Sequence, residues 1–216
     1  EVTYEIEPSI FGSTSDNYSG ITVVVIPESV TYSGITYSVT GIGDYAFNDC
    51  TSLLSIHIPD GVTSIGYGAF RGCSSWSGDI TIPDGITSIE GSAFAGCSSL
   101  TSIKIPNSVT SIEDYAFDAC SSLTSINIPD GLNSIGEYVF YRCTSLPSIT
   151  LPNGVTSIGP MAFGHCSSLT SIKIPNGVTS IGDWAFSYCS GLTSVTCEAN
   201  TPPAVETRAF YQVPTD

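Results

Sequence analysis

Seven cysteines are the residues whose type and spacing point most directly to chemistry. Each follows a phenylalanine by three residues, and successive cysteines are 23 residues apart, with a single interval of 24; the seven are Cys50, Cys73, Cys97, Cys120, Cys143, Cys166 and Cys189. Thiols in such a set could ligate a metal, form disulfides or act as nucleophiles. A sequence period of about 20 to 50 residues, however, indicates a stacked repeat protein, in which equivalent residues form columns.

The register of such a stack argues against disulfides. Equivalent residues of neighbouring in-register strands lie about 4.8 Å apart with parallel side-chain directions. A disulfide needs Cβ atoms about 3.8 Å apart that are turned toward each other. We therefore predict a column of buried free thiols, in keeping with the strong tendency of free cysteine to be buried. The eighth cysteine, Cys197, stands where other repeats have isoleucine, and we expect it in the same core position.

Other catalytic candidates are few. The chain has two histidines, His57 and His165. A Ser-His-Asp arrangement around His57 can be drawn because serine is abundant, but no strained nucleophile motif accompanies it. His165 precedes Cys166 without a second ligand pair at zinc spacing, and the carboxylates lack the ligand series of a calcium loop. We expect no catalytic residues, no metal and no cofactor, and a hydrolase centred on His57 is the third of three hypotheses for function.

The elements that carry these residues are short and recur with the cysteines. In the unit over residues 97–117, Ser-Ile-Lys-Ile-Pro has the alternation of a strand, and proline ends it because proline cannot donate to a ladder. In most units Asp-Gly or Asn-Gly follows, which favours a turn, and then Val-Thr-Ser-Ile as a second extended piece. Gly-x-x-Ala-Phe is too short for an α-helix and predicts an irregular or 3₁₀ turn.

One unit cannot bury its own apolar residues, so the units must stack into a continuous core. The sequence thus predicts a mostly β repeat solenoid with coils of about 23 residues. We expect residues 1–38 to form an N-terminal cap, with a hairpin of segments 2–6 and 21–26 and an irregular first coil, and residues 39–216 to form the solenoid. The extra residue beside Trp76 predicts a bulge near Gly78 and Asp79. We also expect the native chain to continue past residue 216, because an open end exposes a strand edge.

Charge is scarce and one-sided. The chain has 20 acidic residues against 5 basic ones, for a net charge of −15. Binding to nucleic acid needs clustered lysine and arginine, which this sequence lacks, and the same balance disfavours anionic membrane surfaces. No apolar run reaches the roughly 18 residues of a membrane span, so we expect no membrane insertion. The composition is typical of a soluble, exported protein.

The repeat Cys-Ser-Ser-Leu-Thr-Ser-Ile-x-Ile-Pro-x-Gly-Val-Thr-Ser-Ile-Gly-x-x-Ala-Phe resembles the BspA-like leucine-rich repeat of bacterial surface proteins, over about residues 39–213. The departures are Trp76 with its insertion, Val139 for alanine, Cys197 for isoleucine, and a Thr201-Pro-Pro break. The resemblance implies a right-handed leucine-rich-repeat solenoid with a parallel β-sheet on its concave face. It also implies a secreted or surface-anchored protein, with its export signal removed, that binds other proteins or attaches cells to host surfaces without catalysis.

The concave strand face is the default binding surface of such a solenoid. Its exposed central position is the x of Ile-x-Ile, which gives the candidate ligand-binding column His57, Thr81, Lys104, Asn127, Thr150, Lys173 and Thr196. Two of the five basic residues fall in this column. The leading hypothesis is a binding or adhesion module for an extracellular protein or glycan. The alternatives are that these residue types simply suit exposed strands, and that the chain is a structural spacer presenting other domains.

Aromatic residues collect near the turn that precedes each cysteine; they are Tyr45, Tyr115, Tyr138, Tyr141, Trp184, Tyr188 and Tyr211. We predict that these rings cover the turn edge of the coils. The alternative is a continuous exposed stripe, which would indicate an interaction surface.

Overall fold

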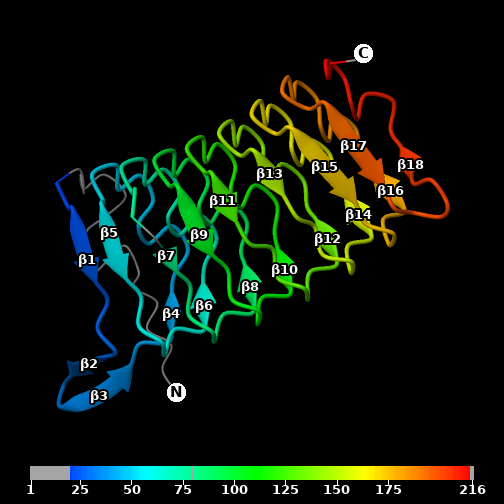
Figure 1. The fold of residues 1–216 in the computed structure, drawn as a ribbon. Helices are drawn as coiled ribbons and strands as arrows, with labels where there is room; N and C mark the ends of the chain where they lie inside the picture. Colours follow the sequence, from blue (N-terminus) through cyan, green and yellow to red (C-terminus); the bar gives the residue numbers. More distant parts are fainter. Residues whose placement is uncertain (1–19, 79, 215–216) are drawn as a thin grey trace.

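The computed structural model describes residues 20–78 and 80–214 as a β-solenoid in which coil stacks on coil from one end of the molecule to the other (Figure 1). Each full coil of about 23 residues contributes two short strands, and equivalent strands of neighbouring coils run parallel. The described residues contain no helix. The prediction of a mostly β repeat solenoid is confirmed.

The first strand row holds the Ser-Ile-x-Ile segments and runs along one face of the solenoid. Its members are β1 (Val23–Val25), β5 (Ser55–His57), β7 (Ile80–Thr81), β9 (Ser102–Lys104), β11 (Ser125–Ile126), β13 (Ser148–Ile149), β15 (Ser171–Ile174) and β17 (Ser194–Cys197). Pairing sets Ser102 beside Ser125, so equivalent residues of neighbouring coils stand side by side. The hydrogen-bonded row is interrupted between β5 and β7 and between β11 and β13. The first interruption coincides with the extra residue that follows Trp76.

The second strand row holds the Thr-Ser-Ile segments. Its members are β4 (Gly41–Ile42), β6 (Ser64–Ile65), β8 (Ser88–Ile89), β10 (Ser111–Ile112), β12 (Ser134–Ile135), β14 (Ser157–Ile158), β16 (Ser180–Ile181) and β18 (Ala204–Val205). In every strand from β6 to β16 the isoleucine is buried. The two rows therefore face the same core from different sides, as Figure 1 shows.

The N-terminal coil differs from the others. Strand β1 pairs in parallel with β5, so it is part of the first strand row. The arm expected over residues 2–6 lies outside the described residues, so the capping hairpin and the division after residue 38 stay predictions. The insertion at Tyr32–Gly34 forms a hairpin of its own, in which β2 (Ser29–Tyr32) pairs antiparallel with β3 (Ile35–Ser38). Ser33 and Gly34 have positive φ values of 50° and 78°, the backbone that a two-residue hairpin turn requires.

The core consists of columns along the solenoid axis. Phenylalanine rings of successive coils stack face to face, for example Phe94 on Phe117 with ring centroids 5.6 Å apart. Trp76 fills the leucine column, is only 1% exposed, and contacts the ring of Phe70 edge-on at 5.2 Å. Of the predicted bulge, Gly78 lies two residues after Trp76, while Asp79 lies outside the described residues. The insertion thus serves to seat a larger side chain in the core.

The cysteine column is buried and reduced, as predicted. All eight cysteines are free, and seven of them are buried. Each buried thiol from Cys73 to Cys189 donates to the carbonyl oxygen of the phenylalanine one coil back; Cys97 Sγ, for example, lies 3.2 Å from Phe70 O. Burial raises the pKa of the Cys97 and Cys143 thiols well above the ordinary value. The thiols are therefore structural donors that stay protonated.

One prediction about the cysteines is wrong. Cys197 has the register expected for a core isoleucine, since it pairs with Ile174 in the first strand row, but it is exposed. The reason is its place on β17, the last strand of its row among the described residues, where no further coil covers it. All four residues of β17 are exposed.

The turn edge, the segment from Gly-x-x-Ala-Phe to cysteine, is held by backbone conformation and a ladder of its own. Most coils place two residues in the left-handed region, such as Tyr115 at φ 62° and Ala119 at φ 55°. Amide groups here donate to the next coil, as in Phe117 N to Val139 O at 3.0 Å. Several aromatic residues of the turn edge, among them Tyr115, Tyr138 and Tyr188, stand at these left-handed positions.

Candidate functional site

The candidate ligand-binding column lies on the first strand row, and all seven of its residues are exposed. Strand pairing brings Thr81 beside Lys104 and Lys173 beside Thr196. Alternation explains this placement, because in the coils before β17 the aliphatic residues on either side of the central residue point toward the core and leave the central side chain outside. The structure thus assembles the column as one row of neighbours.

Three members of the column meet at an open hollow of about 570 Å³, which is lined by Ile80, Thr81, Ser102, Ile103, Lys104, Ser125, Ile126 and Asn127. The amide of Asn127 is already engaged there: its Oδ1 accepts from Ile105 N at 2.9 Å and its Nδ2 donates to Ile105 O at 2.7 Å. These bonds engage backbone groups of Ile105, directly after β9, that face the coil of Asn127. Asn127 is therefore a structural residue as well as a surface one.

The two lysines of the column differ in their surroundings. Lys173 Nζ lies 2.8 Å from Glu198 Oε1, with the two side chains 62% and 39% exposed. An exposed pair of this kind contributes about 0–1 kcal/mol, so a ligand could displace it at little cost. Lys104 forms no ion pair with any described residue. Lys104 is the more available cation of the row.

The hydrolase hypothesis finds no support in the geometry around His57. Its imidazole is exposed and forms no hydrogen bond with a serine or carboxylate of the described chain. Many hydroxyls of other columns instead donate to the preceding coil, as Thr124 Oγ1 does to Thr101 O at 3.0 Å and Ser121 Oγ to Ser98 O at 3.3 Å. Within the described ranges no three His, Cys, Asp or Glu side chains are grouped so as to hold a metal ion.

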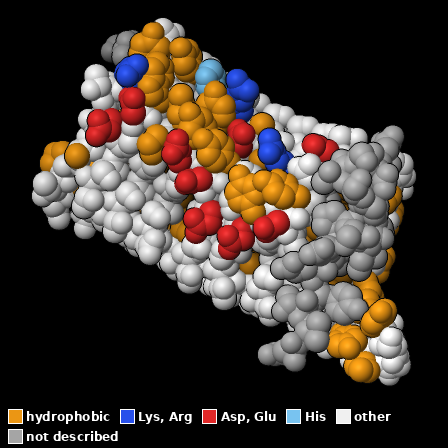
Figure 2. Space-filling model, turned by 180° about the vertical axis from the view of Figure 1, so that it is seen from behind, with side chains coloured by type: hydrophobic (Ala, Val, Ile, Leu, Met, Phe, Trp, Pro, Cys, Tyr) orange, Lys and Arg blue, Asp and Glu red, His pale blue; other side chains and the backbone are white. Residues whose placement is uncertain are grey.

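A second surface feature lies on the turn edge, where the predicted aromatic residues are found. We call it the aromatic stripe and define it as Tyr115, Tyr138, Tyr141, His165, Trp184, Tyr188 and Tyr211. Figure 2 shows hydrophobic side chains running in a band across this face, with charged groups along its margins. Tyr45 pairs separately with Tyr67, at 5.4 Å between ring centroids. The prediction that aromatic rings cover the turn edge holds, and the rings are also partly exposed.

The stripe is continuous because its rings touch from coil to coil. Tyr115 stacks on Tyr138 at 4.7 Å, and Tyr138 meets Tyr141 edge-on at 5.1 Å. His165 bridges the gap: it lies edge-on to Tyr141 at 5.4 Å and stacks on Tyr188 at 4.5 Å. From the sequence, His165 is considered only as a metal ligand, and this role is not predicted. Its position exactly one repeat from Arg142 and Tyr188 was the available signal.

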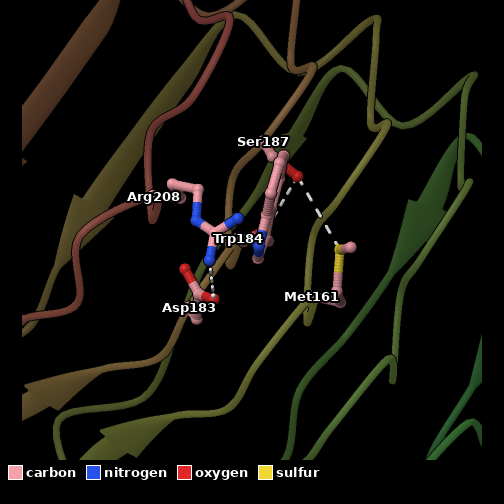
Figure 3. A network of polar contacts seen from close by, with 5 residues as sticks. All are labelled: Met161, Asp183, Trp184, Ser187 and Arg208. Carbon is pink, nitrogen blue, oxygen red and sulfur yellow. Dashed lines mark hydrogen bonds and ion pairs between the residues drawn. The ribbon is translucent and has the colours of Figure 1, made fainter.

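Two arginines lie on the stripe. The guanidinium carbon of Arg142 is 5.1 Å from the centre of the Tyr141 ring, and that of Arg208 is 4.7 Å from the Trp184 ring. Figure 3 shows Arg208 also reaching Asp183, with Nη2 3.6 Å from Oδ2. In the same view Ser187 Oγ donates to Trp184 O at 2.9 Å and lies 3.7 Å from Met161 Sδ, which ties this turn to the coil before it. Partial burial, with Arg142 nearby, lowers the pKa of His165.

The comparisons with known proteins agree with this architecture. The family model for the BspA-type leucine-rich repeat region matches six copies, over residues 17–129 and 110–215. None of the curated protein sequences matches the chain. The described part of the chain has no helix long and apolar enough to cross a membrane.

Solved structures of bacterial leucine-rich repeat proteins superpose on the chain. A leucine-rich cell surface protein from Faecalibacterium prausnitzii is 40% identical, with a TM-score of 0.76, over 86% of this chain and 50% of its own. A leucine-rich repeat protein from T. pallidum is 32% identical, with a TM-score of 0.69, over 79% of this chain and 77% of its own. One from Bacteroides ovatus is 29% identical, with a TM-score of 0.56, over 88% of this chain and 61% of its own.

This chain therefore spans half the length of the Faecalibacterium protein. The matched residues include every cysteine of the buried column and both strand rows, so the likeness covers the repeats that build the core. The chain belongs to the family of BspA-type leucine-rich repeat proteins.

Proposed function

We propose that this chain is a non-catalytic extracellular binding or adhesion module that recognises a protein or glycan through its first strand row. One observation carries the proposal: the seven exposed residues of the candidate column include no acidic residue, in a chain of net charge −15, and hold two of its five basic residues. If these seven positions served only solubility, we would expect them to have the same excess of acidic residues as the rest of the chain. The surface-protein relatives support an extracellular location.

The chemistry of the row favours weak, repeated contacts. Its side chains are small and rich in hydroxyl groups, and it has none of the tryptophan or tyrosine anchors that dominate tight protein interfaces. Equivalent positions recur about every 4.8 Å along the row. A ligand with repeated groups could bind several coils at once and gain affinity through the high effective concentration of the later contacts.

A binding screen against extracellular matrix proteins, mucins and glycans tests the proposal. The variant Lys104→Glu/Lys173→Glu reverses both charges of the row and is expected to lose binding by about tenfold or more. Arg71→Glu is the matched control, because Arg71 is exposed on the turn edge, away from the first strand row. Binding that survives the double variant and falls in the control would contradict the proposal.

A spacer role is the second candidate function, and the regular architecture favours it. The core is continuous from Ile26 to Ala209, so the described coils form a single stiff body. Such a body can hold another domain at a fixed distance without a ligand of its own. Absence of binding across the whole panel would favour the spacer over the binding module.

A further inference from the structure

The aromatic stripe has the composition of a protein-binding hot spot. Tyrosine, tryptophan and arginine are the residues most enriched where a few side chains carry most of the binding energy. Tyr115, Tyr188 and Tyr211 are 37%, 38% and 42% exposed, whereas the phenylalanines of the neighbouring column from Phe117 to Phe186 are fully buried. The fold does not need these rings for its core, since the core is complete beneath them.

The rings are arranged in a way that does not suit carbohydrate. Sugars pack against the open face of an aromatic ring. Two pairs of rings turn their faces toward each other: Tyr115 and Tyr138 are 8° from parallel, and His165 and Tyr188 are 12° from parallel. Arg142 and Arg208 lie over the rings of Tyr141 and Trp184. The ring edges and hydroxyl groups remain for contact, which suits the mixed polar and apolar surface of a protein.

The size of the stripe selects the shape of the partner. Each aromatic side chain has a total surface of about 200 Å², and only part of it is exposed, so the seven together offer an accessible surface on the order of 400 Å². A stable dimer buries about 800 Å² on each partner, so the stripe alone is too small to join two copies of this chain. From Tyr115 to Tyr211 the stripe covers four coil steps, about 19 Å, which is the length of roughly six extended residues. A narrow, straight surface of these dimensions fits an extended segment.

The charges around the stripe indicate that the bound segment carries one carboxylate. Arg142 is exposed and forms no ion pair with any residue that the structure describes. Arg208, by contrast, already reaches Asp183. Burial raises the pKa of Tyr115, and the charges of Glu137, Asp114 and Asp118 raise it further, so three carboxylates lie near the Tyr115 end of the stripe. A segment with many carboxylates would be repelled there. A single carboxylate could pair with the Arg142 guanidinium, whose charge acts on Asp118 without a close ion pair.

We infer that the aromatic stripe is a second binding surface, distinct from the first strand row, for an extended segment of a partner protein that carries apolar side chains and one carboxylate. The apolar side chains contact Tyr138 and Tyr188 on either side of the carboxylate, which pairs with the Arg142 guanidinium. A guanidinium held over a ring is preorganised for this, because less side-chain freedom is lost when the carboxylate arrives.

Selection from a random twelve-residue peptide library displayed on phage tests the inference. Enriched peptides are expected to carry one Asp or Glu within a few residues of aromatic or large aliphatic side chains. Their binding should fall about tenfold or more in Arg142→Gln and in Tyr188→Ser, and stay unchanged in Arg71→Gln. Arg142→Gln retains the backbone donor of residue 142 to Gly164 O, so the fold should be kept; thermal melting followed by circular dichroism checks this.

Several results would overturn the inference. They are no enrichment, enriched peptides without a carboxylate, or binding that is indifferent to both stripe variants. Glycan binding that Tyr188→Ser abolishes would assign the stripe to carbohydrate. A concentration-dependent dimer in sedimentation, lost in Tyr188→Ser, would assign it to a second copy of the chain. None of these outcomes bears on the first strand row, which the lysine variants test separately.

Discussion

Replacing Cys120 by serine tests whether the cysteine column works as a set of buried donors. Cys120 is fully buried, and its Sγ lies 3.2 Å from the carbonyl oxygen of Phe94. Burial also raises the pKa of this thiol strongly, so the group that is replaced is a neutral S–H. Serine has nearly the same shape, and the change therefore isolates the chemistry of the donor atom.

The expected cost follows from bond lengths. A C–O bond is about 0.4 Å shorter than a C–S bond, so the serine oxygen would lie about 3.6 Å from Phe94 O, beyond hydrogen-bonding distance. A buried hydroxyl without a good partner costs about 1–3 kcal/mol. We expect Cys120→Ser to lower the free energy of unfolding by that amount.

Urea denaturation followed by circular dichroism measures the loss, and an unchanged denaturant slope would show that the unfolded state is unaltered. Cys197→Ser is the matched control: its thiol is exposed, so its effect should stay within about 0.5 kcal/mol. Equal effects of the two substitutions would refute the reasoning. So would a titration with a thiol reagent that finds more than one reactive cysteine in the native protein, or fewer than eight after denaturation.

Three further predictions concern the same structure. The native state keeps its thiol protons, whereas the unfolded state loses them above about pH 9, so the native state binds more protons and its stability should fall as pH rises. Burial raises the pKa of Cys189 to about 12, so for this thiol the loss of stability continues to about pH 12. A urea midpoint that stays constant from pH 8 to pH 11 would contradict this prediction. Ala119→Gly should stabilise the folded protein by about 0.5 kcal/mol, because residue 119 has φ 55° and its equivalents one and two coils back are Gly96 and Gly72. Thermal melting measures this gain, and a lower melting temperature would count against the described turn geometry. Trp76→Ala should cost about 3–5 kcal/mol by leaving a cavity against Phe70, and a cost under about 1 kcal/mol in urea denaturation would show that the ring is not packed as described.

Much of the fold could be predicted from the repeat. Alternation in Ser-Ile-x-Ile identified the strands and their exposed central residues, because side chains on a strand point to opposite faces. The same logic predicted the buried thiols from register alone. The candidate column was predicted as a set, and the structure places it together in one exposed row. Its role in binding stays a prediction.

Other features could not be predicted from single units. Cys197 has the sequence position of a core residue, yet its exposure depends on whether a coil lies above it. Asn127 reads as a surface residue, but its amide bonds to the backbone of Ile105 in the coil before it. His165 has no distinguishing feature in its own turn, and it joins the stripe only because Tyr141 and Tyr188 lie in the coils on either side.

The sequence by itself determined the period, the strands, the columns and the composition of each face, because a repeat imposes one local structure and one register on every coil. The tertiary structure alone decided which columns touch across coils, where the first strand row breaks, and which side chains at the last coil stay open. These depend on distances of about 4.8 Å between residues more than twenty positions apart, and so on the stacking itself. The surfaces proposed here for binding exist only in that stack.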